Sequence, residues 1–142
     1  MRVFMLRHAE SRSNAATGVV SLPEKEGDQL SERGLAQAEA AAELISSFGP
    51  ARIVSSPMRR ARETAAPIAA RCGLAVEIWD WTHELVEPAD YPRLSGEEQQ
   101  RRRWSNRMRE HANDPTHAPP GGEAFAGLVG RVERTLERLA DD

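Results

Sequence analysis

The sequence predicts an α/β fold of three layers, in which helices flank a mostly parallel sheet. Two observations lead to this prediction. Short apolar stretches rich in β-branched residues alternate with longer stretches whose apolar residues recur at helical spacing, which is typical of a parallel sheet with crossover helices. The length of 142 residues, of which 39% are hydrophobic, is also the size of one domain. We therefore expect a single domain over residues 1–142.

Three stretches have the pattern of short strands, at residues 1–6, 51–54 and 74–79. The first is strongly apolar, and the polar side chains of Arg7 and His8 follow it directly. We expect it to be a buried strand. The side chains after its end are expected to form a site, because the carboxyl edge of a parallel sheet opens into a crevice.

The helix-like stretches carry start and stop signals. Residues 35–48 have helical spacing, with Ser31 as the predicted N-cap and a stop at Gly49-Pro50. The last helix is predicted near the end of the chain. Its apolar stripe consists of Phe125, Leu128, Val132, Leu136 and Leu139.

Another helix is predicted to begin at Pro57, with Ser56 as its N-cap, because proline is favoured at the first helical position. Pro67 lies inside this helix and cannot donate an amide to the carbonyl group of Glu63. We therefore expect a kink or a break near Ala66.

A small cap region is expected around residues 83–120. Ser95 and Glu98 have the spacing of a capping box, which predicts the start of a charged helix that runs to about His111. Its apolar face is thin, with only Trp104 and Met108, so the helix is expected to lie over the domain as part of this cap.

Composition restricts the classes of partner and cofactor. Nineteen Lys and Arg residues nearly balance 22 Asp and Glu residues, for a net charge of −3, so we expect neither a nucleic-acid nor a membrane partner. The single cysteine, Cys72, cannot form an internal disulfide, and no long apolar run is present, so a cytoplasmic protein is expected. His83, His111 and His117 lack metal-ligand spacing, and no metal site is expected.

Two arginines are placed where an anion could bind. Arg7 stands beside His8 at a predicted strand end, although such a pair alone is more often an ordinary strand end than a site. Arg60 lies in the first turn of the helix that follows the next predicted strand. Amide groups at a helix N-terminus, together with a guanidinium group, favour bound anions.

Four ordered blocks of residues carry a family resemblance. The blocks are Arg7-His8-Ala9-Glu10-Ser11 with Asn14; Leu30-Ser31-Glu32-Arg33-Gly34 with Gln37-Ala38; Ser55-Ser56-Pro57-Met58 with Arg60-Ala61 and Thr64-Ala65; and Gly121-Gly122-Glu123. In this order they resemble the histidine phosphatase superfamily, also called phosphoglycerate mutase-like, over essentially the whole chain. Ala9 stands where the family usually has glycine, which leaves the chemistry intact.

The resemblance implies a phosphomonoester phosphatase that needs neither a metal ion nor an organic cofactor. A neutral imidazole at His8 would attack phosphorus and form a phosphohistidine. Arg7 and Arg60 would hold the equatorial oxygens with planar, permanently charged groups. Asn14 resembles a further polar contact to the phosphoryl group. Positioning and electrostatic stabilisation suffice for a loose transition state.

The resemblance also calls for a carboxylic acid that protonates the leaving oxygen, in the segment after the third strand. Glu87 lies in a stretch similar to the family's Leu-x-Glu pattern, and we favour it. Glu84, beside His83, is the alternative proton donor. Both could also be solvated carboxylates of a loop.

Two other functions are alternatives to the predicted phosphatase activity. A mutase must hold its phosphohistidine away from water, and only about 35 residues separate Glu87 from Gly121, a compact cap that favours access of water. A catalytically inactive phospholigand-binding module is the other alternative. The expected substrate is a phosphate ester, either a small molecule or a phosphoprotein. The sequence does not indicate an oligomeric state.

The resemblance to the family does not extend to one motif that the family contains. In this family a second histidine, in a Ser/Thr-His-Gly stretch that follows another strand, completes the phosphate pocket, and this sequence has no such stretch. The missing strand would lie beside the first one, and its absence would leave strand edges unpaired. We therefore expect the fold to be incomplete at the C-terminus and the native product to be longer.

Overall fold

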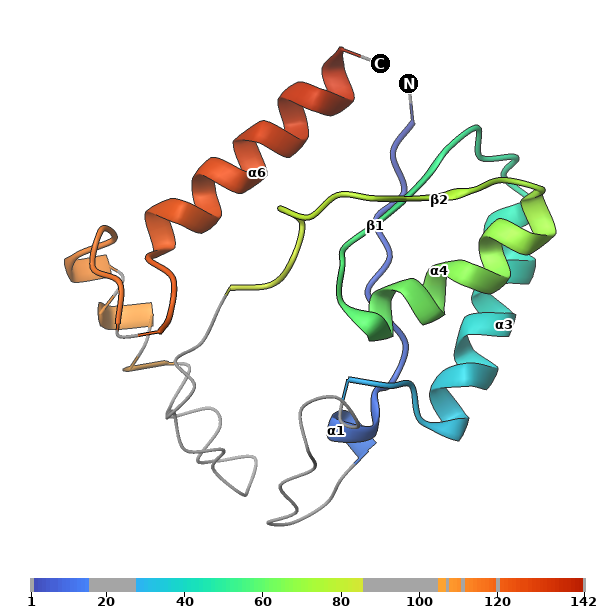
Figure 1. The fold of residues 1–142 in the computed structure, drawn as a ribbon, viewed down its shortest axis with the longest axis horizontal. Coiled ribbons are helices and arrows are strands. Elements are labelled where there is room, and N and C mark those ends of the chain that lie inside the picture. The colour runs from blue at the N-terminus through green and yellow to red at the C-terminus, as the bar shows by residue number, and fades with distance from the viewer. Residues whose placement is uncertain are drawn as a thin grey trace. The chain divides into compact units, whose positions relative to one another are not determined.

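The computed structural model describes residues 2–15, 28–85, 105–106, 108–110, 112–119 and 121–141. The chain divides into two compact units, Met1–Asp80 and Trp81–Asp142. The first unit contains all the described strands and the helices α1, α3 and α4, and the second contains α6 (Figure 1). Each unit is considered by itself.

A two-stranded parallel sheet lies in the first unit, as the sequence predicts. β1 (Ile53–Ser55) and β2 (Val76–Ile78) pair in parallel, with Ile53 opposite Val76. Beside this pairing, Arg52 donates to the two carboxylate oxygens of Glu77 at 2.6 and 2.7 Å. The guanidinium group of Arg52 also lies 5.4 Å from the ring centroid of Trp79. The sheet is therefore reinforced by contacts between side chains at both strands.

Helix α3 (Glu32–Ser46) begins where its local sequence predicts. The Ser31 side chain accepts a hydrogen bond from the Gly34 amide at 3.0 Å, which confirms Ser31 as the N-cap. Ala38 and Ala42 are buried on the inner face of the helix. Such small side chains allow close approach, and α3 packs on the next helix, α4.

Helix α4 (Arg59–Cys72) contacts both strands and also α3, so it lies between the sheet and α3 (Figure 1). The core of the unit forms at this junction. It consists of Ala42, Ile53, Ala65, Ile68 and Ala69.

The start of α4 differs from the prediction. The helix begins at Arg59, two residues later than expected, and its N-cap, Met58, makes no side-chain capping bond. Ser56 instead accepts a weak bond from the Met58 amide, at 3.4 Å. The Arg59 amide donates to a carboxylate oxygen of Asp28 at 2.8 Å. A residue 31 positions earlier in the chain thus takes over the capping role, which local sequence could not indicate.

The predicted break at Pro67 is absent, because α4 is one helix through that residue. Residues on both sides of the proline, including Thr64 and Ile68, are buried against the rest of the unit. Tertiary packing of this kind outweighs the loss of one backbone hydrogen bond. The helix ends at Gly73, whose φ of +67° is the left-handed conformation typical of a glycine cap.

The prediction of a buried N-terminal strand is wrong. Residues 2–10 form no strand, and the side chains that should be buried are exposed, from 46% at Phe4 to 96% at Met5. Phe4 stacks on Phe48 with ring centroids 4.8 Å apart. The reason is that a strand needs a neighbour for its amides and carbonyls, and none in the described part of the chain pairs with this segment.

The second unit contains the amphipathic helix α6 (Phe125–Ala140). Its predicted apolar stripe is present, but no residue of the helix is buried, and Leu136 is 61% exposed. Most of the charged helix predicted from Ser95 lies outside the described residues, although residues 108–110 are helical. None of the described helices is both long enough and apolar enough to span a membrane.

Candidate active site

The ring of His8 contacts the backbone of the next residue. Its Nδ1 atom lies 2.7 Å from the carbonyl oxygen of Ala9. Because a carbonyl oxygen can only accept, this contact favours the tautomer with the proton on Nδ1. In that tautomer the lone pair is on Nε2, which is the atom that would attack an electrophile.

The segment that carries His8 is tied to α4 through Thr64. The Ala9 amide donates to the Thr64 hydroxyl at 3.0 Å, and the same hydroxyl donates to the carbonyl oxygen of Arg60 at 2.7 Å. Thr64 is only 4% exposed. One buried hydroxyl therefore links the residue next to the candidate nucleophile with the backbone of the candidate phosphate ligand.

Glu10 fixes the same segment to the start of α3. The Ser31 amide donates to the Glu10 carbonyl at 2.9 Å, and the Ser31 hydroxyl donates to its carboxylate at 2.7 Å. The Glu10 amide in turn donates to the side chain of Gln37 at 2.9 Å. The backbones approach so closely that a Cβ atom on Gly34 would lie 2.0 Å from the Glu10 carbonyl oxygen. Only glycine fits at this position.

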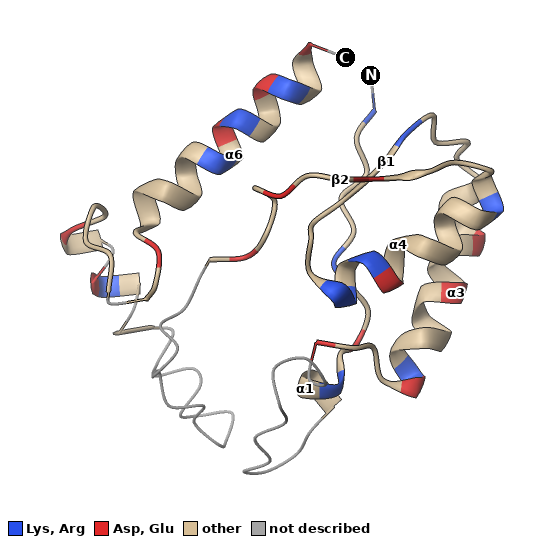
Figure 2. Cartoon of the chain, viewed as in Figure 1, with Lys and Arg blue, Asp and Glu red and all other residues tan. Residues whose placement is uncertain are grey.

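Arg60 lies in the first turn of α4, where basic side chains gather (Figure 2). Its Nη1 atom lies 2.5 Å from a carboxylate oxygen of Asp28, and the two side chains are only 16% and 20% exposed. The other carboxylate oxygen of Asp28 accepts from the Arg59 amide. Asp28 therefore orients the guanidinium group of Arg60 at a helix N-terminus, where the helix dipole favours an anion.

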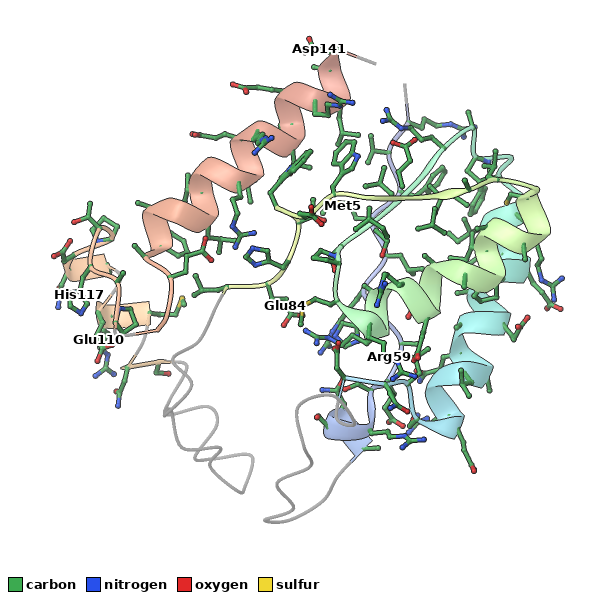
Figure 3. The ribbon with its side chains drawn as sticks, viewed as in Figure 1. Met5, Arg59, Glu84, Glu110, His117 and Asp141 are labelled. Atoms are coloured by element: carbon green, nitrogen blue, oxygen red, sulfur yellow. The ribbon has the colours of Figure 1, made fainter. Side chains whose placement is uncertain are left out.

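The neighbouring Arg59 has a different environment (Figure 3). Its side chain is 46% exposed and pairs with Glu63 at 2.7 Å, one helical turn later. The second carboxylate oxygen of Glu63 accepts from the Leu30 amide at 2.8 Å. Arg59 thus forms a surface pair, whereas Arg60 is held in a less exposed position.

Asn14 is the last but one residue of the short helix α1 (Arg12–Ala15). Its Oδ1 atom accepts from the amide and the hydroxyl of Ser11, at 3.3 and 3.0 Å. Since Oδ1 is occupied as an acceptor, the Nδ2 group is the part of the side chain that could donate to a phosphoryl oxygen. Arg7 is exposed, directly before His8.

Only one of the two candidate proton donors lies within the described residues. Glu84 lies in the second unit, and the Nδ1 atom of His83 contacts its carbonyl oxygen at 2.8 Å (Figure 3). Glu87 lies outside the described residues. The structure thus links the segments of His8 and Arg60 and places Asn14 on the short helix after the His8 segment. It leaves the choice between the two glutamates a prediction.

Two residues of this arrangement were not singled out from the sequence. Asp28 gave no local signal, since its two partners are 31 and 32 residues away. Thr64 belongs to a block that carries the family resemblance, but its sequence position does not reveal that its hydroxyl bridges two segments. Across the described residues, no group of three or more His, Cys, Asp or Glu side chains could hold a metal ion.

Comparison with known proteins identifies relatives of this arrangement. A sequence model described as "Histidine phosphatase superfamily (branch 1)" matches residues 3–142. Glucosyl-3-phosphoglycerate phosphatase of Mycobacterium tuberculosis is 35% identical over 150 residues, which cover 97% of this chain and 60% of that protein. A "Probable phosphoglycerate mutase" of Photorhabdus laumondii is 28% identical over 141 residues, which cover 96% and 62%.

Solved structures agree with the sequence relatives. The mycobacterial glucosyl-3-phosphoglycerate phosphatase in complex with VO3 aligns with a TM-score of 0.67 at 29% identity, over 94% of this chain and 62% of that one. The alpha-ribazole phosphatase of Shigella flexneri aligns with a TM-score of 0.65 at 26% identity, over 96% and 65%. The chain spans 60% to 62% of the length of the two sequence relatives named above.

Proposed function

Because the chain belongs to the histidine phosphatase superfamily, we propose that the protein hydrolyses phosphate monoesters through a phosphohistidine formed on His8. The observation that carries the proposal is the link between the His8 segment and the Arg60 backbone through the Thr64 hydroxyl. This link joins the segment that carries the candidate nucleophile with the first turn of α4, which carries the Arg60 guanidinium group. A nucleophile and a positively charged group are the two parts that phosphoryl transfer needs first.

The reaction proceeds in two steps. Nε2 of His8 attacks phosphorus, and the bond from phosphorus to the ester oxygen breaks as a carboxylic acid protonates that oxygen. Water then attacks the phosphorus of the phosphohistidine and gives a proton to the carboxylate left by the first step, which restores the acid. The bond from phosphorus to Nε2 breaks, and phosphate and the imidazole are released. The positive charges of Arg7 and Arg60 stabilise the equatorial oxygens in both transition states, so the mechanism requires no metal ion.

The proposed substrate is a small phosphorylated metabolite. Two relatives are named as phosphatases of glucosyl-3-phosphoglycerate and of alpha-ribazole phosphate, which are both small phosphate esters. Glu87 is the proposed proton donor and Glu84 the alternative. A phosphotransferase of the mutase kind is the second candidate function, and the resemblance to a "Probable phosphoglycerate mutase" favours it.

The test is burst kinetics and covalent labelling of the purified protein. Mixing with excess chromogenic phosphate ester should give a burst of chromophore and an acid-labile phosphoprotein. The His8→Ala variant should lose the burst and all measurable turnover while it keeps its far-UV circular dichroism. Turnover by His8→Ala at the wild-type rate would refute the role of His8.

The same experiment separates the alternatives. A mutase would return the phosphoryl group to an added acceptor alcohol faster than to water, and a hydrolase would release inorganic phosphate at the rate of turnover. A phospholigand-binding module without catalysis would bind the ester and show neither a burst nor a labelled protein.

A further inference from the structure

A cluster of polar contacts in the second unit is centred on Arg131 of α6. Its guanidinium group donates from Nε and Nη2 to the two carboxylate oxygens of Glu123, at 2.8 and 2.7 Å. The two side chains are only 16% and 19% exposed. This two-point geometry is the strong form of an arginine–carboxylate pair, and we call these two residues the latch.

The latch also binds a stretch of backbone from a distant part of the chain. Nη1 of Arg131 donates to the carbonyl oxygens of Trp81 and His83, at 2.6 and 2.7 Å. These carbonyls lie 50 and 48 residues before Arg131 in the sequence. One guanidinium group therefore fixes both the carboxylate of Glu123 and the path of residues 81–83.

Other contacts hold the same backbone stretch on α6. The indole nitrogen of Trp81 donates to the Thr135 hydroxyl at 3.2 Å, and the guanidinium group of Arg134 lies 4.0 Å from a Trp81 ring centroid. Space around the carboxylate is limited, because a Cβ atom on Gly127 would lie 3.2 Å from Oε1 of Glu123. No residue of α6 is buried, so the contacts that hold residues 81–83 on this helix are mainly polar.

The fixed stretch leads directly into the candidate proton donors. His83 precedes Glu84 by one residue and Glu87 by four. We propose that the latch positions Glu84, the candidate proton donor within the described residues, so that Arg131 and Glu123 are positioning residues for phosphate ester hydrolysis. This inference rests on the proposed function, with Glu84 as its proton donor.

The proposal makes a prediction that a merely structural role does not. Protonation of the leaving oxygen matters for esters of weakly acidic alcohols and hardly at all for activated aryl esters, whose oxygen leaves as a stable anion. Loss of the latch should therefore slow alkyl phosphates selectively. Lysine cannot replace Arg131, because a single ammonium group does not reproduce the two-point contact and the two carbonyl contacts together.

The experiment measures kcat/KM for an alkyl phosphate and for 2,4-dinitrophenyl phosphate in the full-length protein. Arg131→Lys should lower the rate with the alkyl ester by ~10- to 100-fold, since a small misplacement of a catalytic group has effects of that size. The rate with the activated ester should stay within ~3-fold, because its leaving oxygen needs little help from an acid. Glu123→Gln should show the same selectivity, with a lower rate for the alkyl ester and little change for the activated ester.

Two exposed residues of the same unit provide matched controls. Arg109→Lys and Glu133→Gln repeat the two substitutions at positions outside the latch, and both should leave both rates unchanged. If Arg131→Lys fails to fold, as shown by the loss of cooperative thermal melting, the comparison is made with Glu123→Gln. Equal effects on the two esters, or no effect on either, would overturn the proposal.

Failure of the proposed function would look different. In that case the wild-type protein would give no phosphohistidine burst, or His8→Ala would retain turnover. A wild-type burst on His8, combined with equal sensitivity of the two esters in the latch variants, would leave the function intact and exclude only the positioning role.

Discussion

The two adjacent arginines at the start of α4 are predicted to differ in importance. Arg60 is held by Asp28, whereas the more exposed Arg59 pairs with Glu63. Arg60→Lys should lower kcat/KM by ~10²- to 10³-fold, the usual effect of losing one charge-stabilising donor. Arg59→Lys should change it by less than ~3-fold, because an exposed ion pair contributes little and lysine can still form it.

The measurement is steady-state hydrolysis of an aryl phosphate by the two variants and by Arg62→Lys, a control on an exposed face of α4. Similar losses in the Arg59 and Arg60 variants would show that the wrong arginine has been assigned to the phosphoryl group.

Gly34 and Gly130 both lie inside helices, yet alanine is predicted to have opposite effects on them. At Gly34 the new Cβ atom would lie 2.0 Å from the Glu10 carbonyl, so the His8 segment must move away from α3. We expect Gly34→Ala to destabilise the protein by more than ~3 kcal/mol, as severe steric conflicts do. At Gly130 a Cβ atom meets nothing within 4 Å, and helix propensity alone predicts a gain of ~0.5–1 kcal/mol.

Chemical denaturation of the two variants checks this pair. A stable Gly34→Ala protein with normal activity would show that the contact between the His8 segment and α3 is looser than the structure indicates.

The ends of the helices show which features could be predicted from sequence. The start of α3 was predicted because its N-cap, Ser31, bonds to an amide three residues away. The start of α4 was not, because the group that binds its first amide, Asp28, belongs to another segment. Local rules therefore succeed where the partners are close in sequence and fail where tertiary structure supplies them.

The C-terminus of α4 allows a test of the backbone alone. Gly73 has a φ of +67°, and an added Cβ atom would meet nothing within 4 Å. Gly73→Ala should therefore destabilise the protein by ~1–2 kcal/mol through conformation, without a steric clash. Thermal unfolding measures the change, and Gly73→Asn should recover part of it because asparagine tolerates this conformation better.

Apolar exposure in both units leads to a prediction for the molecule as a whole. Val3, Met5 and Leu6 are at least 50% exposed in the first unit, and Val132 and Leu136 in the second. An isolated 142-residue chain with these surfaces uncovered should bind a hydrophobic dye and unfold with low cooperativity. Dye fluorescence and calorimetry of this chain test the expectation.

If the isolated chain unfolds cooperatively and does not bind the dye, these apolar side chains are covered within the 142 residues. The same exposure explains why the predicted N-terminal strand was wrong. Residues 1–6 are apolar, as the prediction required. A strand is buried only if another strand pairs with it, and the sequence of residues 1–6 does not show whether such a partner is present.

The Thr64 hydroxyl also has a consequence for the order of folding. Its bond to the Ala9 amide joins residues 55 positions apart, whereas its bond to the Arg60 carbonyl forms within one helical turn. The long loop must lose entropy before the first bond can form, so we expect that contact to be absent from the folding transition state. Thr64→Val should then speed unfolding and leave the folding rate nearly unchanged, which stopped-flow kinetics can measure. The candidate active site would in that case be the last part of the unit to assemble and the first to come apart.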